Sequence, residues 1–85
     1  MFRSDLTLAD VLTDRDYIIT WIDSNVNHLF EFGLDFNVKI KKLFTSPLNN
    51  PSAYEVMGTV IALRDEVARQ IHVTPLTDDV KRTAV

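Results

Sequence analysis

The side chains that could carry out catalysis or bind a metal are few, and they form no known arrangement. His28 and Glu31 stand three residues apart, a spacing that would place them on one side of a helix. Their order is the reverse of the Glu-x-x-His pattern of di-iron helical bundles, and the chain contains no Cys. His72 stands alone, and no Gly-x-Ser-x-Gly or His-Glu-x-x-His motif occurs. The sequence therefore predicts no enzyme, no metal site and no cofactor.

One basic cluster stands out in a chain whose formal net charge is −3. Lys39, Lys41 and Lys42 could contact phosphates, but no arginine flanks them and no aromatic set for base stacking lies beside them. We interpret the three lysines as the solvated face of a helix. Nucleic-acid binding through them is less favoured than either of the protein-binding functions described below, and the sequence predicts that nucleic acid is not the partner.

Four further residues, two inside apolar helix sides and two on the back of a predicted helix, suggest contacts with another surface. Arg64 falls within the apolar side of a predicted helix, so its charged end either reaches the edge of that side or pairs with a carboxylate, within the chain or across a subunit interface. Asn25 lies inside another apolar side, where a lone Asn can fix the register of paired helices. Gly58 and Ala62 are four residues apart and could allow a second helix to approach closely. The alternative is that both are tolerated surface residues.

The stretch from Tyr17 to Phe32 is the most apolar part of the chain and determines the predicted architecture. Drawn as a helix, its apolar residues cover an arc of roughly 220°, whereas a helix packed on one neighbour needs only about 100°. The sequence predicts a helix over residues 14–32, capped by Thr13 and ended by Gly33. The width of the arc predicts at least two packing partners for this helix.

The rest of the chain is also predicted to be helical. Residues 35–45 fit either a strand, because Phe36, Val38 and Ile40 alternate, or a helix, which we favour because no second strand is evident. After the break at Pro47 and Pro51, the capping-box pattern at Ser52 predicts a helix over residues 53–73. Short helical ends are expected at residues 7–12 and 77–82. The predicted fold is a single all-α domain over residues 1–85, a small helical bundle of two long antiparallel helices and one medium helix, completed by dimerisation.

The predicted function follows from apolar surfaces wider than one short chain can cover. We expect a non-enzymatic helical protein–protein interaction module that acts as a regulator, inhibitor or adaptor of another protein, as a cytoplasmic homodimer without membrane insertion. A structural or chaperone subunit of a larger assembly, such as a virion, is the alternative. None of these patterns is specific to a known family. The residues expected at the protein interface are Ile19, Trp21, Asn25, Phe30, Phe32, Gly58, Ala62 and Arg64.

Overall fold

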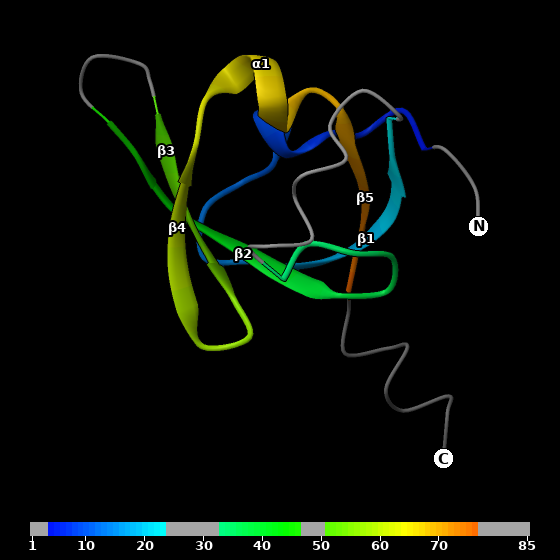
Figure 1. The fold of residues 1–85 in the computed structure, drawn as a ribbon, viewed down its shortest axis with the longest axis horizontal. Helices are drawn as coiled ribbons and strands as arrows, with labels where there is room; N and C mark the ends of the chain where they lie inside the picture. Colours follow the sequence, from blue (N-terminus) through cyan, green and yellow to red (C-terminus); the bar gives the residue numbers. More distant parts are fainter. Residues whose placement is uncertain (1–3, 24–32, 47–50, 77–85) are drawn as a thin grey trace.

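The computed structural model describes residues 4–23, 33–46 and 51–76, which form a five-stranded antiparallel sheet with very little helix. Figure 1 shows the sheet bent, with β3 and β4 to one side of β2, β1 and β5 to the other, and α1 near one end. The strand order is β4-β3-β2-β1-β5, and each neighbouring pair is antiparallel. In chain order the elements are η1 (Leu8–Asp10), β1 (Asp16–Ile22), β2 (Lys39–Thr45), β3 (Ser52–Val56), β4 (Thr59–Leu63), α1 (Asp65–Ala68) and β5 (Ile71–Pro75).

The predicted all-α bundle is wrong. The described part of the predicted helix 14–32 contains β1, and the predicted helix 35–45 contains β2. The predicted helix 53–73 is divided among β3, β4, the four-residue helix α1 and the start of β5. Of the predicted helix 7–12, only the 3-10 turn of η1 is helical, and the turn predicted at 77–82 lies outside the described residues.

The strands form because their residues suit a pleated, half-buried surface. In β1, DYIITWI, β-branched and aromatic residues occupy six of the seven positions, and such residues favour strands. Tyr17 and Ile19 are buried while Ile18, between them, is less so, which is the alternation expected of a strand. The core draws on both terminal and central segments of the described chain: Leu8, Val11, Tyr17, Ile19, Leu34, Ile40, Tyr54, Val56, Ile61, Leu63, Ala68, Ile71 and Val73.

The hairpin between β3 and β4 explains Gly58. Val56 pairs with Thr59, so Met57 and Gly58 form a two-residue loop, and both have positive φ, 51° and 81°. Two successive positive φ values are the signature of a type I′ turn, whose twist matches that of the flanking strands. Gly58 is therefore a turn residue and not a small residue in the interior of a helix.

The two edges of the sheet differ. At the β5 edge, the Val73 N–H donates to the Leu6 carbonyl over 2.9 Å, and the Ser4 hydroxyl donates to the Val73 carbonyl over 2.6 Å. His72 is buried on β5, with its Nδ1 2.7 Å from the Ser4 carbonyl, so that nitrogen carries the proton and donates. The segment before η1 thus covers the β5 edge.

Tyr54 connects β3 to η1 from inside the core. Its side chain is fully buried and its hydroxyl donates to the Leu8 carbonyl over 3.1 Å. Burial raises the pKa of Tyr54 to about 12, helped by the charge of Asp65 and opposed by a side-chain hydrogen bond with Ser52. The fold therefore favours the neutral phenol.

We expect Gly58→Ala to lower the free energy of unfolding by about 1 kcal/mol, because an L residue is strained at this φ. A Cβ at Gly58 would meet no atom within 4 Å, so the cost would come from the backbone alone. Met57→Asn is the matched change in the same loop and should stabilise the protein slightly, since Asn-Gly is a preferred type I′ pair. Urea unfolding measures both, and an unchanged midpoint for Gly58→Ala would contradict the turn assignment.

The pKa of Tyr54 predicts alkaline destabilisation. In the unfolded chain the phenol ionises near its ordinary value of 10.0, whereas in the fold its pKa is about 12. The contribution of the neutral Tyr54 phenol to the free energy of unfolding is therefore fully present below pH 10. It is lost as the pH rises towards 12, by at most about 2.7 kcal/mol. Tyr54→Phe should lose about 1 kcal/mol at neutral pH with its hydrogen bond to Leu8, yet should lack this part of the alkaline decline.

Chemical denaturation at several pH values tests this expectation. Tyr17→Phe is the control for removing a tyrosine hydroxyl, because the Tyr17 oxygen accepts from the Leu12 N–H over 3.1 Å. That variant should keep the alkaline decline. Parallel pH profiles for the wild type and Tyr54→Phe would show that Tyr54 does not cause it.

Candidate functional site: a charged cavity on the sheet

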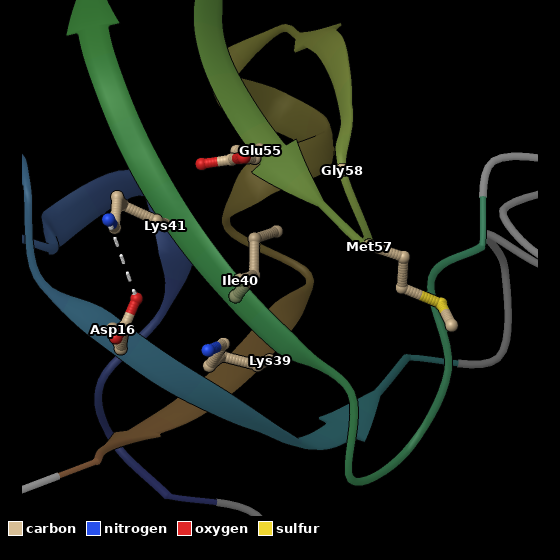
Figure 2. A pocket seen from close by; sticks show the side chains of 7 residues that line it. All are labelled: Asp16, Lys39, Ile40, Lys41, Glu55, Met57 and Gly58. Carbon is tan, nitrogen blue, oxygen red and sulfur yellow. Dashed lines mark ion pairs between the residues drawn. The ribbon is translucent and has the colours of Figure 1, made fainter.

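A cavity of about 390 Å³ lies over β1, β2 and the β3–β4 hairpin. Figure 2 shows the side chains around it, with Asp16 and Lys41 pointing toward one another and Met57 extending from the hairpin turn. Four of the seven lining residues are charged, and their formal charges cancel. The cavity is lined by Asp16, Lys39, Ile40, Lys41, Glu55, Met57 and Gly58.

Strand register places three charges in a row. Lys41 on β2 is directly opposite Asp16 on β1 and directly opposite Glu55 on β3. The Lys41 Nζ is 3.9 Å from Asp16 Oδ1, and both side chains are about one third exposed. An ion pair this exposed stabilises a protein by only about 0 to 1 kcal/mol. The row of charges therefore contributes little to the stability of the sheet.

Four members of the lining are exposed: Lys39, Glu55, Met57 and Gly58. Lys39 is opposite Ile18, and within residues 4–23, 33–46 and 51–76 it makes no ion pair. Met57 is 79% exposed, and its flexible thioether suits contact with varied apolar surfaces. The cavity therefore offers a cation, a carboxylate and an apolar side chain to an approaching molecule.

The three lysines do not share one surface. Lys39 is exposed, Lys41 is half-buried beside Asp16, and Lys42 is buried. Successive side chains of a strand point to opposite faces of the sheet, so Lys42 lies on the face opposite to that of Lys41. The interpretation of these lysines as a solvated helix face is wrong.

The predicted interface residues fall into three groups. Gly58, Ala62 and Arg64 lie together along the hairpin and β4 or directly after it, and Ala62 and Arg64 are exposed. Trp21 is partly exposed on β1, with its ring centroid 6.3 Å from that of Phe36, while Ile19 is fully buried in the core. Asn25, Phe30 and Phe32 lie outside the described residues. Nothing in the sequence pattern pointed to Asp16, Glu55 and Met57, because only strand pairing brings them together.

The described residues include one close pair of possible metal ligands and no larger set. His72 Nε2 is 3.6 Å from Asp23 Oδ1, while Nδ1 already faces the Ser4 carbonyl. Within the described ranges, no group of three or more His, Cys, Asp or Glu side chains is arranged to hold a metal ion. His28 and Glu31 lie outside those ranges. No helix in the described part of the chain is long and apolar enough to span a membrane.

Comparison with known proteins identifies the domain family that this chain matches. The sequence model of the FeoA domain matches residues 6–75. Comparison with curated protein sequences gives no match. Among solved structures, the FeoA-like protein of Clostridium acetobutylicum is 22% identical, with a TM-score of 0.78 over 91% of this chain and 92% of that one.

Two longer proteins contain a similar domain. Iron(II) transport protein A of Clostridium thermocellum is 19% identical, with a TM-score of 0.77 over 84% of this chain. The manganese-activated repressor ScaR is 28% identical, with a TM-score of 0.75 over 84% of this chain. This chain spans 46% of the first protein and 35% of the second.

These findings overturn the predicted function. A helical interaction module needs helical surfaces, and the described chain presents a sheet with a match to the FeoA domain. Two alternatives, a virion or chaperone subunit and a nucleic-acid regulator that uses a lysine helix, were based on the same predicted helices. They are replaced together with those helices.

We expect Asp16→Asn to lower the free energy of unfolding by no more than about 1 kcal/mol, with the difference vanishing at high salt. The reason is the exposure of the pair with Lys41. Glu55→Gln is the matched change on the other side of Lys41 and should have a smaller effect still. Urea unfolding at low and high salt measures both; a loss above about 2 kcal/mol would indicate a buried charge network instead.

Proposed function

This chain belongs to the FeoA domain family, and we propose that it is a non-enzymatic domain that takes part in iron(II) transport by binding a protein component of the transport machinery. The observation that carries this proposal is the family match, which extends over residues 6–75. The name of the similar Clostridium thermocellum protein, iron(II) transport protein A, points to the same process. The proposed location is the cytoplasm.

The cavity supports a binding role for this domain. Its lining combines opposite charges with an exposed methionine, which suits the rim of a protein interface better than a site for a bond-breaking reaction. Lys39 and Glu55 would contact opposite charges on the partner, while Met57 would be buried by it. In this proposal iron(II) is the cargo of the partner and not a resident cofactor of this domain.

A metal-dependent regulator is a second candidate, favoured by the 28% identity to the manganese-activated repressor ScaR. In that case the chain would act on gene expression and not on transport itself. The two candidates differ in timing, because a transport partner alters uptake within minutes whereas a regulator alters transcript levels first.

Uptake of radioactive iron(II) by the organism that encodes this chain tests the leading proposal. Deleting the gene should reduce initial uptake several-fold without a preceding change in transcripts for iron transport, and the wild-type gene should restore it. An unchanged uptake rate would contradict the proposal, and a change in transcripts alone would favour the regulator.

Complementation with variants tests the proposed surface. Lys39→Glu and Met57→Glu should restore uptake poorly, because both introduce a negative charge where the partner binds. Arg69→Glu is the matched control, since Arg69 is exposed on the segment after α1 and does not line the cavity. Equal restoration by all three variants would place the binding surface elsewhere.

A further inference from the structure

We propose that β4 pairs with β4 of a second copy, antiparallel and about a two-fold axis, so that the two sheets join edge to edge. This inference rests on the described strands and not on the proposed role in iron(II) transport. It assigns an occupant to the one sheet edge that the described part of the chain leaves uncovered.

The backbone groups of the β4 edge are available for pairing. The type I′ turn makes Val56 and Thr59 a hydrogen-bonded pair, and such pairs alternate along an antiparallel hairpin. The N–H and C=O groups of Val60 and Ala62 therefore face away from β3. No backbone hydrogen bond within the described ranges reaches either residue from that side.

The β4 edge also lacks the features that usually prevent pairing. Natural edge strands carry charged residues, prolines or bulges, or are covered by another segment. The β4 sequence TVIAL has no charge and no proline, and its pairing with β3 shows no register shift, unlike that of β1 with β5 or β2 with β3. Val60 is 61% exposed. The β5 edge, by contrast, is covered by the segment that contains Ser4 and Leu6.

The free groups are arranged so that a second copy of β4 can satisfy all of them. Because the free groups belong to Val60 and Ala62, an antiparallel copy can place Val60 opposite Ala62 of the second copy, and Ala62 opposite its Val60. Ile61 then lies on the two-fold axis, and each pairing of Val60 with Ala62 exchanges two hydrogen bonds. Every free backbone group of these two residues finds a partner, and the exposed Val60 side chain gains an apolar neighbour.

The charges at the ends of the strand are complementary in this register. Val60 lies opposite Glu55 on β3, so Glu55 is one strand away from the proposed interface. Arg64 follows β4 by one residue and is exposed. In the antiparallel pair, Arg64 of each copy reaches the hairpin end of the other, where Glu55 supplies the opposite charge. The contact occurs twice and opposes incorrect registers.

The proposed dimer is weak because the strand is short. Five residues of edge pairing bury less surface than a stable interface of standard size, so dissociation should be seen on dilution. Sedimentation velocity across micromolar to submillimolar concentrations should show the wild-type chain passing from monomer to dimer. The amides of Val60 and Ala62 should be protected from hydrogen exchange only at the higher concentrations.

Val60→Lys should remain monomeric throughout, because a charge on the edge opposes pairing. Leu12→Lys is the matched control, since Leu12 is 58% exposed and lies outside β4, and it should dimerise as the wild type does. Arg64→Glu should weaken the dimer at least several-fold, and the double variant Glu55→Arg with Arg64→Glu should restore it. Circular dichroism on each variant confirms that folding is retained.

Three results would overturn the proposal. One is a wild-type chain that stays monomeric over the whole range, and another is dimerisation of Val60→Lys equal to that of the wild type. The third is protection of Val60 and Ala62 only after another protein is added to a monomeric chain, which would show that an extended segment of that protein occupies the edge instead.

Discussion

The inner face of the sheet has to cover itself, because the described chain supplies only η1 and the four-residue α1 as helical cover. A flat five-stranded sheet would leave that face exposed to water. Register shifts occur between Lys42 and Phe44 in the central strand β2 and between Ile19 and Trp21 in its neighbour β1. Such irregularities bend and twist a strand. The bend brings residues from both sides of the sheet into one core, on which the rest of the structure depends.

The same bend determines what remains on the surface. Once Tyr17, Ile40 and Tyr54 point into the core, their neighbours along each strand face outward. Asp16, Lys41 and Glu55 are those neighbours, and the register aligns them across three strands. The cavity is thus a by-product of the inward pattern, and its charges are ordered although none of their pairings is strong.

The sequence predicted the composition of the core better than its geometry. Many of the residues assigned to apolar helix faces are indeed buried, among them Ile19, Ile40 and Ile71. The helical interpretation was wrong because strands of five to seven residues, read together with their turns, also satisfy a helical period. The pattern of residues 35–45 fitted both a strand and a helix, and the strand, which includes Ile40, is the correct alternative.

Gly58 was the clearest misread signal. A glycine in a helix interior lowers the stability of the helix, which argues against a helix at this position. Gly58 follows Met57 between two segments rich in strand-forming residues, where a tight turn is expected. Ser52, taken as a helix cap, is buried in β3 and its hydroxyl contacts that of Thr45 over 3.4 Å. The cavity could not have been predicted at all, because cross-strand neighbours such as Asp16 and Glu55 are far apart in sequence and only the strand order unites them.

The asymmetry of the two sheet edges has a consequence for solubility. A sheet open at both edges can add further copies without limit, which is the geometry of fibrils. Here Ser4 and Leu6 bind the β5 edge, so another copy can pair with the sheet only at the β4 edge. The few residues before η1 therefore limit edge-to-edge pairing to two copies. Without them the β5 edge would be open as well, and further copies could add to form a fibril.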